Sequence, residues 1–486
     1  MAVKVIKTSE IEEQVAQLIQ QANRFLPLDV LQAMERARDA EEDSGARLIL
    51  DILLENAELS RTSGLPVCQD TGIDVVFVQA GPDCLVEGDV MSAINSGIAR
   101  GTREGYLRKS VCDPVTRKNT GDNTPAVVHW FVSTEPGFRL SVLPKGCGSE
   151  NMSALKMLPP SAGLEGVADF VLERIRQAGP NPCPPGIAGI GIGGTMEQAA
   201  LLAKKALLRP VGKSNPRSDL AQLEQSLLSR INGLGIGPQG LGGSTSALSV
   251  AVEAFPCHIA SLPVALNIQC HAARRAVACF QDGRWKMEET GKIMATGRSG
   301  AMNSLLSLAK ALDLPLSREK VSGLRAGDWV KLSGRILTGR DQTHRRLCEL
   351  MDDGVSLPVE LENQLIYYVG PSPAPPGHVI GSAGPTTSYR MDAYTPRILS
   401  RGVLGLMGKG KRSPDVVESI KEHGAVYLAT IGGAGAFLSS CITASRVVAF
   451  EDLGPEALYE LEVKDFPAVV INDSLGNDYY SMIRPD

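Results

Sequence analysis

Three of the ten cysteines occur in short polar or proline-rich sequences that are typical of loops. Cys68 lies in LPVCQDTG, Cys183 in NPCPPG and Cys270 in NIQCH, and none of the three belongs to a CxxC pair. Three thiolates from distant loops suit a [4Fe–4S] cluster in which one iron lacks a protein ligand, whereas four suit a closed electron-transfer cluster. An iron with an open position can act as a Lewis acid. The spacing alone also fits three ordinary buried cysteines.

Asp70 follows Cys68 by two residues, so its carboxyl group would lie close to anything bound at that thiol. From there it could act as a general acid or base on a molecule bound at that thiol. The sequence Asp-Thr-Gly also fits an aspartate whose side chain caps a turn. The position alone therefore supports two hypotheses, a general acid and a structural turn residue.

A glycine-rich segment raises a second class of enzyme. Residues 189–194, GIGIGG, satisfy the GxGxxG pattern of nicotinamide-dependent oxidoreductases. Ser214 stands where that fingerprint requires an acidic residue about 20 positions further on, and Cys183 with three prolines precedes it instead of a clean strand. An iron–sulfur sensor that binds nucleic acid is the non-enzymatic alternative, but the sequence shows no basic recognition helix.

The composition is that of a soluble globular protein. The length of 486 residues predicts two or three domains, and an active site between domains is a reasonable expectation. Hydrophobic residues make up 43% and the formal net charge is -5, so the chain as a whole would not attract nucleic acid or an anionic membrane. A small anionic substrate would therefore need a locally basic pocket.

Three features predict a cytoplasmic protein. The first residues, MAVKVIKTSEIEEQ, contain no apolar signal core. The uncharged segment 426–445 is long enough to span a bilayer, but its glycines and serines favour a buried segment of a soluble protein. Ten cysteines in an intracellular chain indicate thiol or metal chemistry rather than structural disulfides.

The hydrophobic periodicity predicts a mixed α and β fold. Ser9 and Glu12 fit a capping box before an amphipathic helix, and a second helix over 46–59 is expected to stop at Gly64. We expect strands at 74–80, 126–132, 264–268, 328–332, 366–369, 425–429, 447–450 and 468–471, and helices at 161–177, 196–207 and the middle of 296–317. A new β-rich start after Pro315 places the domain boundary near residue 313.

Six motifs, in the same order, resemble class I fumarases and their tartrate-dehydratase relatives. They are LPVCQDTG (65–72), PKGCGSENMS (144–153), NPCPPGIAGIGIGGT (181–195), PCHIASLPVALNIQCHAARRA (256–276), LSGRILTGRDQTHRR (332–346) and GPTTSYRMD (384–392). The resemblance covers nearly the whole chain, with α-subunit-like and β-subunit-like parts fused in that order. It implies a two-domain α/β (mixed α+β) fold, with an iron–sulfur domain over 1–312 and a swivelling β/β/α-type domain over 313–486.

The resemblance also implies roles for individual residues. It makes Cys68, Cys183 and Cys270 the cluster ligands, Asp70 the acid, and Thr386 the base that removes the C3 proton. The substrate contacts that it implies are Gln69, Arg108, Gly146, His258, Arg340, Arg390 and Lys409. Arginine suits this role because its planar fork binds a carboxylate through two hydrogen bonds.

Cys147 departs from the family pattern, in which a small residue stands at the centre of the Lys-Gly-Cys-Gly-Ser turn. A fourth thiolate at this position would close the cluster and block chemistry at an open iron. We interpret Cys147 instead as a small thiol that lines the pocket.

Thr386 raises a different question, because a threonine hydroxyl is intrinsically a poor base and must be activated by its surroundings.

By the same resemblance, the chain is expected to be a hydro-lyase that reversibly hydrates fumarate to L-malate, a step of the tricarboxylic acid cycle. A homodimer is expected, without a nucleic-acid or membrane partner. L-tartrate and mesaconate or citramalate stay open as substrates, because motifs that bind carboxylates do not distinguish acids that differ by a methyl or a hydroxyl group.

Overall fold

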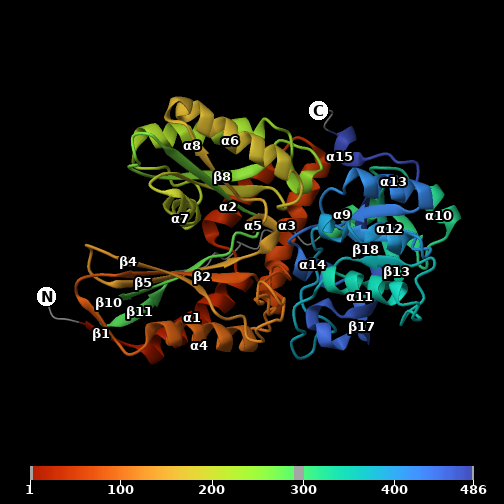
Figure 1. The fold of residues 1–486 in the computed structure, drawn as a ribbon, viewed down its shortest axis with the longest axis horizontal. Coiled ribbons are helices and arrows are strands. Elements are labelled where there is room, and N and C mark those ends of the chain that lie inside the picture. The colour runs from red at the N-terminus through yellow and green to blue at the C-terminus, as the bar shows by residue number, and fades with distance from the viewer. Residues whose placement is uncertain (1–3, 289–299, 484–486) are drawn as a thin grey trace.

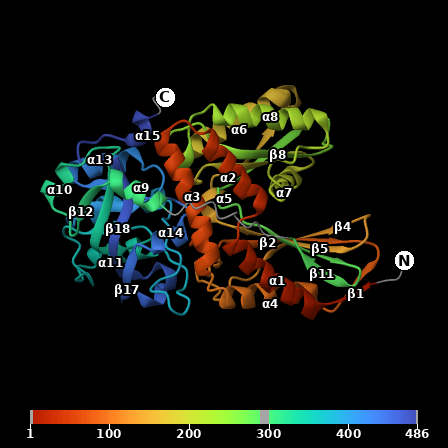
Figure 2. The ribbon, with the colours of Figure 1, turned by 180° about the vertical axis from the view of Figure 1, so that it is seen from behind.

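The computed structural model describes residues 4–288 and 300–483, which form three lobes (Figure 1). The residues up to Met287 form two lobes, each built on its own sheet, and the residues from Ala301 onward form the third. The long helix α3, Ser44–Ser63, runs between the lobes, as the view from behind shows (Figure 2). It ends where the sequence predicted, because Gly64 adopts a φ of 75° and caps it. The loop with Cys68 follows directly.

The first lobe is a five-stranded sheet, in the order β11-β10-β5-β2-β4, packed against two helices. Its main elements are α1 (Thr8–Arg24), β2 (Ile73–Ala80), α4 (Val90–Glu104), β4 (Val127–Val132), β5 (Phe138–Lys145), β10 (Ala276–Gln281) and β11 (Arg284–Met287). A short parallel pair, β1 (Lys4–Lys7) and β3 (Cys84–Glu87), lies beside them. Ile11, Val15, Leu18 and Ile19 of α1 are buried, as their helical spacing predicted.

The capping box predicted for the first helix is wrong. Thr8 and Ser9 are already helical, because α1 begins directly after strand β1 ends at Lys7. A similar contact is made two residues earlier, where Glu10 Oε2 accepts the backbone N–H of Lys7 at 3.0 Å. The sequence therefore predicted a helix here correctly, but it placed the start of that helix at the wrong residue.

The second lobe is a four-stranded sheet in the order β6-β9-β7-β8, covered by helices. Its elements are α5 (Cys147–Glu150), β6 (Ala154–Leu158), α6 (Gly163–Ala178), β7 (Gly186–Gly193), α7 (Met196–Ala206), α8 (Ser218–Asn232), β8 (Ala247–Phe255) and β9 (Leu262–Gln269). Helix α2 (Leu28–Ala40) joins α1 to α3.

The GxGxxG segment does not form a phosphate-binding turn. Gly189 and Gly191 lie inside strand β7, whereas the dinucleotide fingerprint places its glycines in the turn after a strand. A Cβ atom at either glycine would strike the backbone carbonyl oxygen of Ala203 or Ala199 in α7. These glycines therefore allow α7 to pack closely on the strand, and the nicotinamide hypothesis loses the motif on which it depended.

The third lobe contains a small closed barrel. Its sheet has the order β12-β13-β14-β15-β16-β18-β17, and β13 also pairs with β18, so β13, β14, β15, β16 and β18 close into a ring. The strands are β12 (Lys310–Asp313), β13 (Trp329–Thr338), β14 (Leu365–Tyr367), β15 (Gly405–Gly408), β16 (Val426–Ala429), β17 (Ile442–Ala449) and β18 (Leu458–Asn472). The helices are α9 (Ala301–Leu308), α10 (Arg318–Ser322), α11 (Asp341–Asp352), α12 (Thr395–Leu399), α13 (Pro414–His423), α14 (Gly435–Ser439) and α15 (Tyr479–Met482).

Strand β12 already pairs with β13, so the seven-stranded sheet begins at residue 310, slightly before the boundary that the sequence suggested at 313. The helix expected in the middle of 296–317 is α9, although residues 296–299 lie outside the described residues. The uncharged segment 426–445 forms β16, the five-residue helix α14 and the start of β17. Among the described helices, none combines the length and the apolar character that crossing a membrane requires.

Candidate active site

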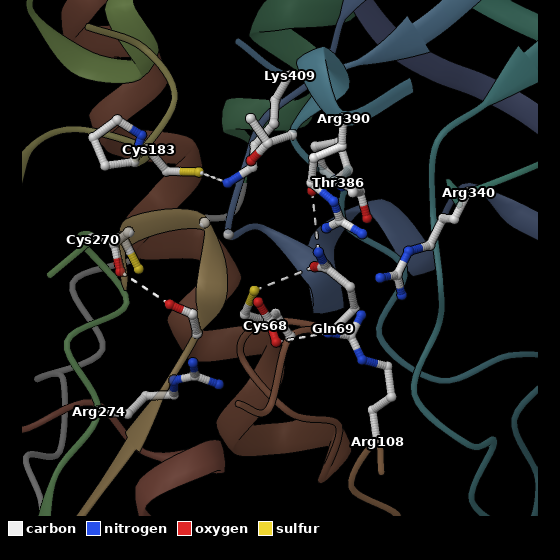
Figure 3. A pocket seen from close by; sticks show the side chains of 18 residues that line it. Cys68, Gln69, Arg108, Cys183, Cys270, Arg274, Arg340, Thr386, Arg390 and Lys409 are labelled. Atoms are coloured by element: carbon white, nitrogen blue, oxygen red, sulfur yellow. Dashed lines mark hydrogen bonds and ion pairs between the residues drawn. The ribbon is translucent and has the colours of Figure 1, made fainter. Parts of the chain in front are cut away.

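One cavity lies where the three lobes meet (Figure 3). Residues from both halves of the sequence line it. Of the twelve residues that the sequence singled out, eleven line this cavity, namely Cys68, Gln69, Asp70, Arg108, Gly146, Cys183, Cys270, Arg340, Thr386, Arg390 and Lys409.

The three cysteines reach the cavity from three separate loops (Figure 3). Cys68 lies between α3 and β2, Cys183 lies between α6 and β7, and Cys270 follows β9 directly. Cys183 adopts a φ of 56°, in the left-handed region that residues other than glycine rarely occupy. Such conformations concentrate at functional sites, where the surrounding structure holds them.

The arrangement of the three thiols bears on the kind of metal group that they could hold. Across residues 4–288 and 300–483, no three His, Cys, Asp or Glu side chains are arranged to hold a single metal ion. A cluster presents its irons at separate corners, so its thiolate ligands need not converge on one point. The three thiols line the same cavity, which ligands of one cluster must do.

Cationic side chains lie beside the thiols. Lys409 Nζ is 2.6 Å from Cys183 Sγ. Burial raises the pKa of the Cys68 thiol to about 11, while the charge of Arg274 acts in the opposite direction. A metal that binds such a thiol deprotonates it, and the nearby cations would then offset the charge of the thiolates.

Both carboxylate oxygens of Asp70 accept hydrogen bonds. Arg108 Nη2 donates to Oδ1 at 2.6 Å, and the backbone N–H of Cys147 donates to Oδ2 at 2.9 Å. Burial by itself would raise the pKa of Asp70, but the charges of neighbouring arginines, Arg108 foremost, outweigh it and lower the pKa to about 2. Asp70 is therefore ionised near neutral pH.

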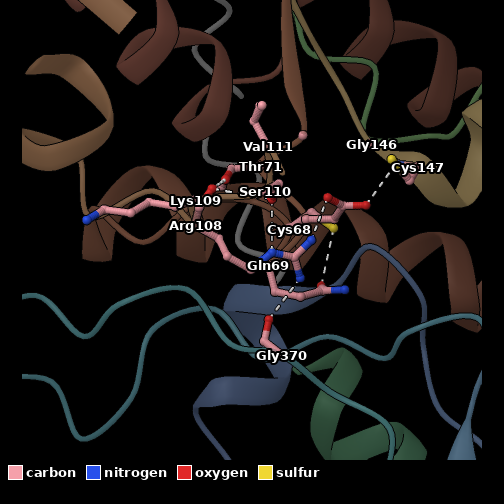
Figure 4. A network of polar contacts seen from close by, with 12 residues as sticks. Cys68, Gln69, Thr71, Arg108, Lys109, Ser110, Val111, Gly146, Cys147 and Gly370 are labelled. Atoms are coloured by element: carbon pink, nitrogen blue, oxygen red, sulfur yellow. Dashed lines mark hydrogen bonds and ion pairs between the residues drawn. The ribbon is translucent and has the colours of Figure 1, made fainter. Parts of the chain in front are cut away.

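Arg108 ties this carboxylate to the third lobe. Its Nη1 donates to the backbone carbonyl oxygen of Gly370 at 2.9 Å, and its Nε donates to Ser110 Oγ at 3.2 Å (Figure 4). The side chain is only 6% exposed. Arg108 thus orients Asp70 in addition to the contact with substrate that the resemblance implied.

Arg340 and Arg390 are each held by an acidic partner. Arg340 Nη2 lies 3.2 Å from Glu456 Oε1, and Arg390 Nε donates to Asp341 Oδ1 at 3.1 Å. The Nε of Arg340 is buried and has no partner among the residues that the structure describes. These two guanidinium groups, with Arg108, Arg274 and Lys409, make the cavity locally basic in a chain of net charge -5. A small anionic substrate would need such a pocket.

Thr386 lies on the cavity wall near Arg390 and Lys409 (Figure 3). Its backbone N–H donates to the carbonyl oxygen of Tyr368 at 2.7 Å, which fixes the loop. Positive charges near a hydroxyl group favour its deprotonated form. The two cations are therefore the candidates for the activation that a threonine base requires.

Gln69 and Gly146 shape the same wall. Gln69 Nε2 donates to the carbonyl oxygen of Pro385 at 3.1 Å, and its Oε1 accepts from the Cys68 thiol at 3.3 Å. A Cβ atom on Gly146 would lie 3.3 Å from Asp70 Oδ2 and 3.2 Å from Arg274 Nη2. Glycine thus leaves the carboxylate and the guanidinium close together.

Two residues that the sequence analysis placed at the pocket do not line this cavity. His258 lies outside the cavity, because it precedes β9 while Cys270 follows the other end of that strand, and eight residues of strand extend about 26 Å. It lines a separate surface hollow with Met196 and Phe255. Cys147 is exposed and does not line the cavity, so its contribution is the backbone N–H that Asp70 accepts.

Arg274 is a cavity residue that the sequence analysis missed. It is 1% exposed, and its Nη1 donates to Asn23 Oδ1 at 2.9 Å. The available signal was a pair of arginines in apolar sequence four residues after Cys270. The second member of the pair, Arg275, forms an ion pair with Asp29 instead. Adjacent residues of one type do not reveal which of them faces a site.

A cavity of this kind, with an ionised carboxylate and thiols among cations at a junction of lobes, marks an enzyme that acts on a small anion. Sequence comparison defines the family. The profile described as "Fumarate hydratase (Fumerase)" matches residues 12–279, and the one described as "Fumarase C-terminus" matches residues 287–483. The chain belongs to the class I fumarate hydratase family.

Individual relatives agree with this assignment. The chain is 32% identical to a putative class I fumarate hydratase of Geobacillus stearothermophilus, over 98% of this chain and 96% of that protein. It is 31% identical to the aerobic class I fumarate hydratase of Escherichia coli (strain K12), over 94% of this chain and 87% of that protein. It is 44% identical to a putative L(+)-tartrate dehydratase subunit alpha of Methanocaldococcus jannaschii, over 55% of this chain and 96% of that protein.

Proposed function

We propose that this chain is an iron–sulfur hydro-lyase that reversibly hydrates fumarate to L-malate. The observation that carries the proposal is the single cavity on which three cysteines, an ionised aspartate and five cationic side chains converge. The relatives named class I fumarate hydratase, which match nearly the full chain, support fumarate as the substrate.

The cofactor of this proposal is a [4Fe–4S] cluster held by Cys68, Cys183 and Cys270. When bound, it supplies a Lewis-acidic iron without a protein ligand, which polarises a hydroxyl group without net redox change. Lys409 lies against Cys183 and offsets the charge of the thiolates on that side.

The arginines bind and orient the diacid. Arg340 and Arg390 retain guanidinium N–H groups beyond those used by Glu456 and Asp341, and these can bind the carboxylates of the substrate. Because acidic partners fix both guanidinium groups, little side-chain freedom is lost when the substrate binds. Closure of the cavity from both halves of the chain would exclude bulk water.

Two residues move the protons. In the direction of hydration, Asp70 accepts a proton from the water whose oxygen bonds to C2, and C3 receives a proton from Thr386. Dehydration reverses both steps, so Thr386 takes the C3 proton and Asp70 returns its proton to the departing oxygen.

A substrate panel tests the proposal. After anaerobic purification and reconstitution with iron and sulfide, we expect hydration of fumarate, measured as loss of its alkene absorbance. Mesaconate hydration and L-tartrate dehydration serve as competing assays, since one relative is named as a tartrate dehydratase subunit. A higher kcat/KM for either competitor would move the assignment to that acid.

Exposure to air should inactivate the enzyme progressively. The reason is that an iron without a protein ligand is oxidised and lost more readily than one with full ligation. We expect ferrous iron with a thiol reductant to restore the activity, as followed by anaerobic assay and iron content. An enzyme that stays active in air and in the presence of chelators would contradict the cluster proposal.

A cytoplasmic homodimer completes the proposal. All ten cysteines are free thiols, as expected in a reducing compartment. Met157, Met196, Phe255 and Ile259 are large apolar side chains exposed on the second lobe, and such a patch favours association with another copy. Light scattering of the purified protein would give the mass of the assembly.

A further inference from the structure

A short loop of the third lobe touches all three cysteine loops. The docking loop, Gly432-Gly433-Ala434-Gly435, follows β16 and includes the first residue of α14. The cysteines belong to the first two lobes, more than 160 residues away in the sequence. The docking loop is therefore the place where the C-terminal half meets the ligand loops directly.

The Cys183 loop is joined to the docking loop through Gln239. Gln239 Oε1 accepts the backbone N–H of Gly432 at 2.8 Å. Its Nε2 donates to the carbonyl oxygen of Gly432 at 3.2 Å and to that of Pro184 at 3.3 Å. One buried amide thus links Gly432 to the residue that follows Cys183.

The Cys270 loop is joined through His271. Its Nε2 lies 2.8 Å from the carbonyl oxygen of Gly432, and because a carbonyl oxygen only accepts, the ring nitrogen donates. His271 is 1% exposed. The residue next to the third cysteine is thus bound to the same glycine as Gln239.

The Cys68 loop is joined by backbone and by Asn56 of α3. The N–H of Gly435 donates to the carbonyl oxygen of Val67 at 3.0 Å. Asn56 Nδ2 donates to the carbonyl oxygens of Val67 at 3.1 Å and Gly433 at 3.3 Å, and its Oδ1 accepts the N–H of Phe437 at 2.9 Å. Asn56 is fully buried, so losing these bonds would leave unpaired polar groups inside the protein.

Only glycine fits at the points of closest approach. A Cβ atom on Gly435 would lie 2.9 Å from the backbone nitrogen of Gln69 and 3.1 Å from Cys68 Cα. A Cβ atom on Gly432 would strike Cys183 Sγ, and one on Gly433, where φ is 77°, would strike the His271 ring. The docking loop therefore packs backbone against each ligand loop.

We propose that the docking loop is a positioning element that holds the three cysteines in the arrangement that the cofactor needs. This inference rests on the proposed iron–sulfur site. The ligand set then becomes complete only when the third lobe is docked, and the coupling is reciprocal: the bound cofactor strengthens docking by as much as docking strengthens cofactor binding.

The test compares Gly435→Ala and Gln239→Asn with the parent chain after anaerobic reconstitution. Substitution of a residue that supports a metal ligand typically lowers metal affinity by about 10–100-fold. We therefore expect iron loss to a chelator to accelerate at least about 10-fold in both variants. Gln239→Asn shortens the amide while keeping a residue that tolerates the left-handed φ of 57°. The matched control is Gly323→Ala, an exposed glycine with a φ of -82° whose added Cβ meets only ordinary contacts, the nearest at 3.5 Å.

A second measurement does not need the cofactor. In the cluster-free proteins, alkylation of Cys68, Cys183 and Cys270 should be faster in both variants than in the parent, with Cys84 as the reference thiol and unchanged far-UV circular dichroism. Parent-like chelator resistance and alkylation in both variants would overturn the inference. A parent chain that takes up no iron and sulfide would instead overturn the proposed function, so the two failures are distinguishable.

Discussion

Alanine at Cys68, Cys183 or Cys270 should each abolish cluster assembly and reduce the hydratase activity to background. Each thiol is one of the three proposed ligands, and each comes from a different loop, so no neighbouring cysteine in the same loop can replace it. Iron and sulfide content after reconstitution, visible absorbance and fumarate hydration measure the effect.

The control for this prediction is Cys84→Ala. Cys84 lies on the short strand β3 of the first lobe and is half-buried. Cys348 is a weaker control, because it is 4% exposed in the core of the third lobe and its truncation would leave a cavity that lowers the stability. Full iron content in any of the three ligand variants would remove that cysteine from the ligand set.

The loops that carry the chemistry could be recognised from the sequence because their signals are local. Proline on both sides of Cys183 and the end of a helix before Cys68 are features of a few neighbouring residues, and the structure has loops there. The meeting of these loops in one cavity depends on how three lobes pack. Residue types and spacing do not contain that information, so only the family resemblance indicated it.

The misplacement of His258 has the same origin. His258 and Cys270 lie in the same motif, residues 256–276, but strand β9 separates them and places them at its opposite ends. Distance along the sequence was a poor guide to distance in space here because a strand is the most extended element. Arg274 was missed for a different reason, since the sequence does not show which of two adjacent arginines faces the cavity.

The third lobe shows which parts of a fold are predictable. The expected strand 468–471 is the apolar end of β18, a strand of 15 residues. Its first half alternates charged and apolar residues and was not recognised as part of the same strand. The closure of the barrel depends on this long strand, because β18 pairs with β13, β16 and β17. Such pairing is non-local and cannot be deduced from periodicity.

Arg390→Lys should weaken binding of the diacid and misplace it. Lysine keeps the positive charge but loses the planar fork, and the bonds of Arg390 to Asp341 are lost with it. A hydrogen bond to a charged group contributes about 1.5–3 kcal/mol, so we expect KM to rise about 10-fold or more, with a lower kcat as well. Steady-state kinetics with fumarate and with L-malate give both constants.

Thr386→Ala should instead reduce kcat with little change in binding. If Thr386 exchanges the C3 proton, its loss removes a contribution that is typically about 10²–10⁴-fold for a general base, while the arginines and the cluster thiols remain in place. The substrate should then still perturb the visible spectrum of the reconstituted variant at concentrations close to those of the parent chain. Near-normal kcat in Thr386→Ala would exclude it as the base and direct attention to Lys409, whose ammonium group lies on the same wall, or to Asp70.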